Sequence, residues 1–448
     1  MKPLVYFFAF QVLAIVFSCS GTQNKVDNST NDNEKPNLVI IFCDDLGYGD
    51  VGCFGATDIS TPNIDQMATD GMKFTEFYSA SPVCSPSRAA LMTGRYPQRM
   101  GINSVFFPES LTGMAPEEVT IAEKLKEKGY ATGIVGKWHL GHLHQFLPLQ
   151  QGFDSYFGIP YSNDMESVVY MEGNEVVEFH VDQRYTTKTY TEKAVEFIND
   201  NAEEPFFLYL AHSMPHVPIY ASEDFLGTSE RGLYGDVVQE IDWSVGEVIN
   251  SLKANNVLDN TLVVFSSDNG PWLVMEDHGG SAGGLREGKQ YTFEGGQRVP
   301  TLAMWPEVIK PGSEYHNLAT MMDWFPTAVE MTGGDLPADR PIDGVSLMPV
   351  LKGEGERLPQ KFLYFDLDDL QCYREGDWKY KEAFQGFEGA IWKQAVEAHP
   401  PLLINLKEDP GEQNNLAEQY PEKVDEMIQK MNQEFQSMGE LPPSLVIR

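Results

Sequence analysis

Short apolar runs alternate with segments of helical periodicity along the chain from Pro36 onward. This alternation predicts an α/β fold in which helices cover a large mixed, mostly parallel sheet. The run from Leu38 to Cys43 is apolar throughout, as expected for a strand covered on both faces. Further strands are predicted at residues 131–135, 206–210 and 261–266.

Helical periodicity predicts helices at residues 61–71, 120–129 and 236–254. Thr120 and Glu123 have the spacing of a capping box, and a glycine ends each of the first two helices. In the third helix one face packs on the sheet, because apolar residues recur every four positions, at Val237, Ile241, Val245 and Ile249.

The pattern changes near residue 350. Short strands without intervening helices are predicted at residues 362–367, 378–382 and 402–406, and a polar helix follows Pro421. We therefore expect a smaller C-terminal subdomain with an antiparallel sheet.

The first residues read as an export signal. Lys2 precedes an apolar run, residues 4–17, that is too short for a stable membrane span. The run ends in Val-Phe-Ser-Cys19, which resembles a bacterial lipoprotein signal cleaved before a lipidated cysteine, and a polar tether follows. The alternative is plain secretion with Cys19 removed or free. Either way the mature protein leaves the cytoplasm, for the periplasm or the cell surface.

The expected organisation is a signal peptide at residues 1–18, a tether at 19–35, a catalytic domain at 36–355 and a C-terminal subdomain at 356–448. A net charge of -34 excludes nucleic acid as a partner, because phosphate binding needs basic surface. It also excludes electrostatic attraction to anionic lipid, which leaves the N-terminal lipid as the only membrane contact. Cys43 is expected to be an inert core residue, and a disulfide among Cys43, Cys53 and Cys372 stays open.

Polar residues follow the ends of two apolar strands, directly in the first case and after Ser267 in the second. Asp44 and Asp45 follow the first strand, and Asp268 and Asn269 follow the strand at 261–266. Open α/β sheets build their sites at such strand ends. Either pair alone would more often be an Asp-rich turn, whereas the two together predict oxygen ligands for a hard cation.

Basic residues follow two other strands. Lys137 and His139 alternate, so their side chains point the same way in extended chain. His212 and His216 follow the strand at 206–210. A lone histidine here would more often be structural, but three histidines beside acidic ligands favour chemistry.

Cys84 is expected at the start of a helix that has Pro86 in its first turn. Amide donors and the helix dipole favour anions at that position, and Arg88 can reach back to it. The pattern indicates a cysteine near positive charge. A buried structural thiol is an equal alternative on these grounds.

Two motifs in this region resemble the signatures of the type I sulfatases. The first is Cys84-x-Pro86-x-Arg88 followed by Thr-Gly-Arg, and the second is the run Gly-Tyr-Ala-Thr-Gly-Ile-Val-Gly-Lys-Trp-His-Leu-Gly at residues 129–141. The stretches 36–50, 158–164, 286–300 and 409–416 resemble the arylsulfatase A and N-acetylgalactosamine-6-sulfatase branch. The resemblance implies the fold of the alkaline phosphatase superfamily.

The resemblance also implies the site. Cys84 is converted to formylglycine by a maturation enzyme, and one calcium ion is bound by residue 84 together with Asp44, Asp45, Asp268 and Asn269. The family's remaining active-site positions match Arg88, Lys137, His139, Ser162, His216 and Lys289. Of these, Lys137, Ser162, His216 and Lys289 are expected to contact the substrate.

The implied mechanism uses the two hydroxyls of the hydrated aldehyde. One attacks sulfur with Asp268 as base, while Lys137, Lys289 and Arg88 stabilise charge on the sulfate oxygens. His216, with Lys289 as a second candidate, protonates the leaving alcohol, and His139 takes the proton of the second hydroxyl as sulfate is expelled.

The expected substrate is a sulfated saccharide or an aryl sulfate. The alternatives are an arylsulfatase of broad specificity, a phosphoester hydrolase of the same superfamily and a glycan-binding lipoprotein with an unconverted Cys84. The sequence leaves open which sugar and which sulfate are recognised, and whether action is endo or exo.

Overall fold

The computed structural model of the protein describes residue 1, residue 4, residues 35–165 and residues 167–446. The chain divides into two units, Met1–Glu34 and Lys35–Arg448, and every element below belongs to the second. Cys19 and the expected signal and tether lie outside the described residues, apart from residues 1, 4 and 35. Among the helices described, none is both long and apolar enough to span a membrane.

The large sheet has ten strands in the order β11-β2-β10-β9-β1-β8-β4-β5-β6-β7. Their bounds are β1 Asn37–Cys43, β2 Met72–Phe74, β4 Ala131–Gly136, β5 Ser155–Gly158, β6 Val169–Glu172, β7 Glu175–Phe179, β8 Phe206–Ala211, β9 Thr261–Ser267, β10 Thr301–Met304 and β11 Ser313–Tyr315. Its centre, β9-β1-β8-β4-β5, is parallel, while β10, β6 and β7 pair antiparallel to their neighbours. The predicted α/β fold and the four predicted strands are thereby confirmed.

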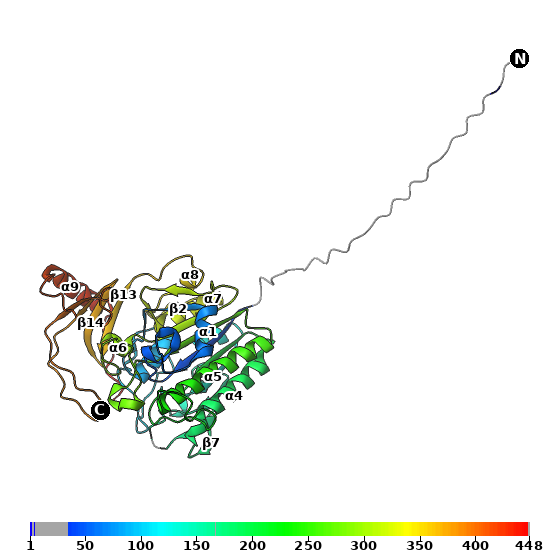
Figure 1. Ribbon diagram of the computed structural model, residues 1–448, viewed down its shortest axis with the longest axis horizontal. Helices are drawn as coiled ribbons and strands as arrows, with labels where there is room; N and C mark the ends of the chain where they lie inside the picture. Colours follow the sequence, from blue (N-terminus) through cyan, green and yellow to red (C-terminus); the bar gives the residue numbers. More distant parts are fainter. Residues whose placement is uncertain (2–3, 5–34, 166, 447–448) are drawn as a thin grey trace. The chain divides into compact units, whose positions relative to one another are not determined.

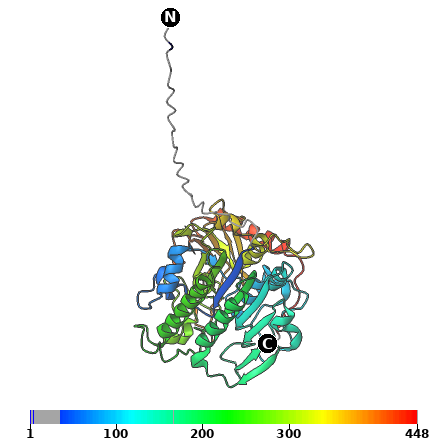
Figure 2. The ribbon, with the colours of Figure 1, turned by 90° about the vertical axis from the view of Figure 1, so that its right-hand side faces the viewer.

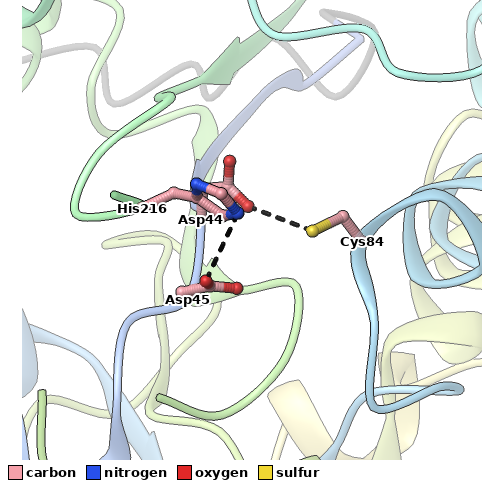
Figure 3. Close-up of side chains that lie close together, drawn as sticks. All are labelled: Asp44, Asp45, Cys84 and His216. Carbon is pink, nitrogen blue, oxygen red and sulfur yellow. Dashed lines mark hydrogen bonds and ion pairs between the residues drawn. The ribbon is translucent and has the colours of Figure 1, made fainter. Parts of the chain in front are cut away.

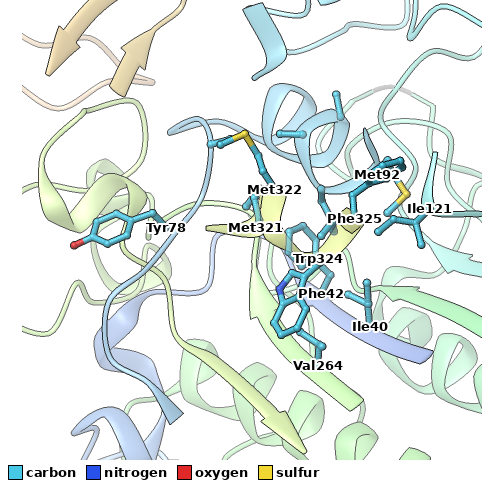
Figure 4. Close-up of a cluster of buried hydrophobic side chains, with 14 of the residues drawn as sticks. Ile40, Phe42, Tyr78, Met92, Ile121, Val264, Met321, Met322, Trp324 and Phe325 are labelled. Atoms are coloured by element: carbon cyan, nitrogen blue, oxygen red, sulfur yellow. The ribbon is translucent and has the colours of Figure 1, made fainter. Parts of the chain in front are cut away.

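Strand β1 is buried on both faces, which explains its unbroken apolar run. Leu38, Ile40 and Phe42 point into one core, and Val39 and Ile41 into the other. Burying one such side chain contributes about 1.5–3 kcal/mol. In the first core Ile40, Phe42 and Val264 lie near Trp324 and Phe325 (Figure 4).

Helices cover both faces of the sheet. Their bounds are α1 Pro62–Asp70, α2 Cys84–Thr93, α3 Ile121–Lys126, α4 Thr186–Asn201, α5 Leu233–Ala254, α6 Glu294–Gln297, α7 Trp324–Met331, α8 Met348–Leu351 and α9 Pro421–Ser437. The long helices α4 and α5 lie side by side on one face, as Figures 1 and 2 show. Helices α2, α3 and α7 supply side chains to the core on the other face.

The helix boundaries differ slightly from those predicted. The capping box of Thr120 and Glu123 is present, but α3 ends at Lys126, because the chain closes into tight turns before Gly129. Helix α5 begins at Leu233, three residues before the predicted start.

The C-terminal sheet is antiparallel, as predicted, in the order β13-β14-β15-β16. Its bounds are β13 Lys361–Asp366, β14 Asp369–Glu375, β15 Trp378–Lys381 and β16 Leu402–Asn405, and a small pair joins β3 Phe77–Tyr78 to β12 Ala319–Thr320. Strand β14 was not predicted. Helix α9 packs on this sheet (Figure 1).

Candidate active site

The acidic pairs after β1 and β9 meet because these strands are parallel neighbours, with Cys43 in register with Ser267. The Asp45 amide donates to Asp268 Oδ1 at 3.1 Å, and Asn269 Nδ2 donates to Asp45 Oδ1 at 2.7 Å. Asp45 adopts a left-handed backbone with φ of 64°, a conformation that is costly for a non-glycine residue and typical of functional sites.

Cys84 is the first residue of α2, and its side chain faces these acids (Figure 3). Its Sγ lies 3.4 Å from Asp44 Oδ1. Asp44, Asp45, Cys84 and His216 each place one potential ligand atom within 4.8 Å of the others, and all four are buried. The helix predicted from Pro86 therefore brings Cys84 to the predicted acidic site.

Three buried cations neutralise the three carboxylates. Lys137 Nζ donates to Asp44 Oδ2 at 2.5 Å, and Lys289 Nζ donates to Asp45 Oδ2 at 2.7 Å. Arg88 donates to Asp268 Oδ2 through Nε at 3.1 Å and Nη2 at 2.8 Å. The sequence-predicted acids and cations thus form one connected cluster.

Ser162 and Lys289 extend the cluster towards residue 84. Lys137 Nζ also donates to Ser162 Oγ at 3.1 Å, and Lys289 Nζ lies 3.6 Å from Cys84 Sγ. Ser162 follows β5, and Lys289 lies between Glu287 and Gln290, which both have left-handed backbones. Their loops, rather than regular elements, carry these two side chains.

Close backbone packing positions Lys137. Gly136 ends β4 with φ of 118°, and a Cβ there would lie 1.9 Å from Ala211 O. Only glycine fits, and the Lys137 amide then donates to the same carbonyl at 2.8 Å.

The carboxylates and the thiol respond differently to burial. Although burial alone would raise the pKa of Asp44, the Lys137 ammonium and its neighbours hold it well below its usual range. Burial and the charge of Asp44 raise the pKa of Asp268 to about 7. Burial also raises the pKa of the Cys84 thiol well above its usual value, despite Lys137 and Lys289. The predicted positive charge is present, but an unmodified Cys84 is a neutral, weakly nucleophilic thiol.

The donor set fits a hard divalent cation. Asn269 Oδ1 is buried and has no hydrogen-bond partner among the described residues. With the carboxylates of Asp44, Asp45 and Asp268 it forms an oxygen-rich group, which calcium prefers. A bound cation would satisfy this oxygen and favour the ionised form of Asp268.

His139 is held as a neutral base. Its Nε2–H donates to Phe106 O at 2.9 Å, and its buried Nδ1 has no hydrogen-bond partner in the described part of the chain. Burial and the nearby Lys137 ammonium lower the pKa of His139 well below its usual value. Nδ1 is therefore available to accept a proton.

His216 presents its other ring nitrogen to the site. Its Nδ1 donates to Val217 O at 2.6 Å, and its Nε2 lies 3.6 Å from Asp45 Oδ2. Burial and the Lys289 ammonium lower the pKa of His216.

His212 does not join the site, although the sequence grouped it with the other two histidines. Its Nε2 lies 3.2 Å from Ser244 Oγ, and its ring packs against Tyr190. Burial lowers its pKa to about 3. It is a packing residue between β8 and the helices α4 and α5.

The cysteines outside the site are also structural. The four cysteines that the structure describes, Cys43, Cys53, Cys84 and Cys372, are all free. Cys43 is fully buried, and burial raises the pKa of its thiol, as expected of an inert core residue.

A cavity of about 980 Å³ opens above the cluster. Cys84, His139, Ser162, His216 and Lys289 line it. Sequence reasoning missed its outer wall, which comes from loops and from the C-terminal region and includes Glu109, Asp164, Trp272, Asp366, Trp392 and Lys393. These residues form no local motif, so only the fold reveals them.

Comparisons with known proteins match this chain to sulfatases over most of its length. A family model described as Sulfatase matches residues 36–334, and one described as N-sulphoglucosamine sulphohydrolase, C-terminal, matches residues 287–440. The chain is 38% identical over 459 residues to N-acetylgalactosamine-6-sulfatase of Homo sapiens, covering 92% of this chain and 88% of that protein.

Solved structures are similar as well. One from a study of glycosaminoglycan metabolism by Bacteroides thetaiotaomicron has a TM-score of 0.83 and 30% identity, covering 90% of this chain and 99% of that chain. Another, Ps i-CgsB in complex with a neocarrahexaose, has a TM-score of 0.80 and 30% identity, and the match covers 92% of this chain and 94% of that chain. The matches span both the large sheet and the C-terminal sheet.

Proposed function

Because the chain belongs to the sulfatase family and is a sulfuric ester hydrolase, we propose that it removes sulfate from sulfated saccharides with a formylglycine made from Cys84 and one calcium ion. One observation carries the proposal. Cys84 Sγ lies at the base of the cavity, 3.4 Å from the Asp44 carboxylate and 3.6 Å from the Lys289 ammonium. Residue 84 thus meets the incoming ester beside a cation site.

The saccharide substrate is supported by the similar proteins. The human relative is named for N-acetylgalactosamine 6-sulfate, one similar structure belongs to glycosaminoglycan metabolism, and another holds a neocarrahexaose. N-acetylgalactosamine 6-sulfate is therefore the first sugar to test. An arylsulfatase of broad specificity is the alternative.

Calcium would be held by Asp44, Asp45, Asp268 and Asn269 together with residue 84. Bound there, it supplies positive charge that polarises the sulfate oxygens. The aldehyde hydrate at residue 84 supplies the hydroxyl nucleophile that a buried neutral thiol lacks. A formylglycine-generating enzyme is the partner required for this modification.

The protein's own cations have different tasks. Although burial opposes it, the Asp45 carboxylate raises the pKa of Lys289, so Lys289 stays charged and stabilises the sulfate oxygens. Lys137 lies between Asp44 and Ser162 and would serve the same oxygens. Arg88 is occupied by Asp268 and by Lys137 O, so its geometry favours orienting Asp268 over contacting the substrate.

Proton transfer falls to three groups. Asp268, whose ionised form a bound cation would favour, accepts the proton of the attacking hydroxyl. His216 lines the cavity, and its imidazolium form, which Asp45 Oδ2 at 3.6 Å from Nε2 stabilises, donates the Nε2 proton to the leaving sugar oxygen. The strongly charged Lys289 is a poor donor for that step. His139 Nδ1 accepts a proton from residue 84 when sulfate departs.

Export and anchoring complete the proposal. We expect cleavage before a lipidated Cys19, a catalytic domain at residues 36–355 and a C-terminal subdomain at 356–448. Membrane fractionation of the wild type and of Cys19→Ala tests the anchor. A wild-type protein in the soluble fraction would favour plain secretion.

The function is tested by sulfate release. The protein co-produced with a maturation enzyme is assayed with N-acetylgalactosamine 6-sulfate, 4-nitrophenyl sulfate and the matched phosphate monoesters. Sulfate release well above phosphate release is expected, and Cys84→Ala should abolish it. Preferential phosphate release would favour the phosphoester hydrolase.

A further inference from the structure

An irregular arm of the C-terminal region reaches the catalytic cavity. It spans residues 384–399, between β15 and β16, and pairs Phe384 with His399, Phe387 with Val396 and Ala390 with Lys393. Its tip supplies Trp392 and Lys393 to the cavity wall.

Contacts to the catalytic domain fix the position of this arm. Trp272 Nε1–H donates to Trp392 O at 2.8 Å, and the Tyr291 hydroxyl donates to Gln394 O. Within the C-terminal subdomain itself, Lys393 Nζ lies 3.3 Å from Asp366 Oδ2 of β13. Trp272 and Tyr291 flank the loop of Lys289, so the arm is attached to the wall that carries a catalytic cation.

Two tryptophans mark a path outward from the catalytic groups. The Trp272 ring lies 5.3 Å from the His216 ring and 4.5 Å from Lys289 Nζ, centroid distances that place it beside the leaving-group side of the site. Trp392 lies further out and is 58% exposed, which is unusual for a side chain held against a cavity. An exposed indole here offers an apolar face to whatever carries the sulfate.

Charge changes sign along the same path. The base of the cavity holds the ammonium of Lys289, whereas the outer wall carries the carboxylates of Glu109, Asp164 and Asp366. Lys393, the one lysine of the outer wall among the described lining residues, is paired with Asp366. An anionic group fits at the base and is disfavoured at the rim.

We propose, on the basis of the sulfatase function above, that the outer wall selects an uncharged sugar ring carrying a single sulfate, with Trp392 as the stacking platform. The sulfate enters the cationic base, and the ring carrying it lies against the exposed indole. A second sulfate or a carboxylate on the same ring meets Glu109 and Asp164 and is rejected. Trp392, Glu109 and Asp164 are therefore specificity-determining residues.

The test uses a matched pair of substrates. These are the methyl glycosides of N-acetylgalactosamine 6-sulfate and of its 4,6-disulfate, with 4-nitrophenyl sulfate as a reference that presents no sugar ring. At low salt kcat/KM is expected to be at least about threefold to tenfold higher for the monosulfated sugar, and the ratio should shrink as salt screens the rim. A ratio near one, or a preference for the disulfate, would overturn the inference.

Glu109→Gln/Asp164→Asn tests the charge. The double variant should reduce the ratio of kcat/KM between the monosulfated and the disulfated sugar by about threefold or more. The control Glu203→Gln/Glu354→Gln removes as much charge from exposed positions outside the lining, and it should leave the ratio as in the wild type. Equal effects of the two double variants would show that net charge alone acts.

Trp392→Ala tests the platform. It should lower kcat/KM for the monosulfated sugar by about fivefold to tenfold, the size of a single aromatic contact, through KM rather than kcat. Trp392→Phe should restore most of the loss. Ile391→Ala, at the neighbouring exposed position outside the lining, serves as the control for arm folding. An unchanged KM in Trp392→Ala would show that Trp392 is not the surface on which the sugar ring stacks.

Failure of this inference is separable from failure of the function. If the protein hydrolyses 4-nitrophenyl sulfate but does not discriminate between the two sugars, the proposed selectivity of the outer wall is wrong and the sulfatase function stands. If no sulfate ester is hydrolysed, both the sulfatase function and the selectivity of the outer wall are contradicted.

Discussion

Arg88 donates two hydrogen bonds to one oxygen of Asp268, through Nε at 3.1 Å and Nη2 at 2.8 Å, and neither side chain has exposed surface. A third donor of the same guanidinium, Nη1, reaches Lys137 O at 3.2 Å. Arg88 therefore ties the strand end that carries Asp268 to the one that carries Lys137.

Replacing Arg88 with Lys tests this link. An ammonium has the charge but not the planar fork, so Asp268 should lose its fixed orientation. We expect kcat to fall by about a hundredfold, with a smaller change in KM. A kcat within about twofold of wild type would show that charge alone is sufficient.

Asn269 is expected to contribute to cation affinity. Its Oδ1 is buried without a hydrogen-bond partner in the described chain, while its Nδ2 holds Asp45 in place. Asn269→Ala should weaken calcium binding by about tenfold to a hundredfold. The readout is the calcium-dependent rise in melting temperature after chelation, because a ligand that binds only the native state stabilises it. An unchanged calcium titration would contradict the assigned ligand set.

His216 is expected to matter most for poor leaving groups. Sugar alcohols leave as unstable alkoxides unless protonated, whereas an activated aryl alcohol leaves unaided. His216→Ala should therefore lower kcat by about a hundredfold on a sulfated sugar and by far less on 4-nitrophenyl sulfate. Equal losses on the two substrates would remove His216 as the general acid.

The C-terminal sheet is tied to the catalytic domain by a buried ion pair network. Lys379 Nζ of β15 contacts Glu294 Oε1 of α6 at 3.0 Å and Glu412 Oε1 at 2.9 Å, and all three side chains are buried. Lys379→Met would leave the buried Glu412 without its cation and Glu294 with Arg298 alone at 3.6 Å, and it should lower the free energy of unfolding by about 3–5 kcal/mol.

Chemical denaturation measures this change. Lys407→Met, at an exposed position, is the matched control and should change stability by no more than about 0.5 kcal/mol. Similar unfolding midpoints for the two variants would contradict a structural role for Lys379.

The centre of the site could be predicted because it depends on strand ends. Asp44 follows a run that is apolar at every position, Asp268 follows a buried strand with an apolar centre, and parallel pairing of β1 and β9 brings the two together. The family resemblance, which the comparisons confirm, added Ser162 and Lys289, whose loops carry no periodic signal.

The outer wall could not be predicted for a physical reason. Trp392 stands on an arm held by isolated bridges and by contacts to residues about a hundred positions away, so its place depends on tertiary packing. For His212 the sequence predicted a role in the site that the structure does not support. It follows a strand as the catalytic histidines do, but its ring turns towards Ser244 and Tyr190 instead of the cavity.

The most direct test of the central claim is mass spectrometry of the peptide that contains residue 84, paired with the specific activity of the same preparation. Preparations made with and without the maturation enzyme give different fractions of formylglycine. We predict that activity on sulfate esters rises in proportion to that fraction and vanishes when residue 84 is entirely cysteine. Full activity with an unmodified Cys84 thiol would contradict the account.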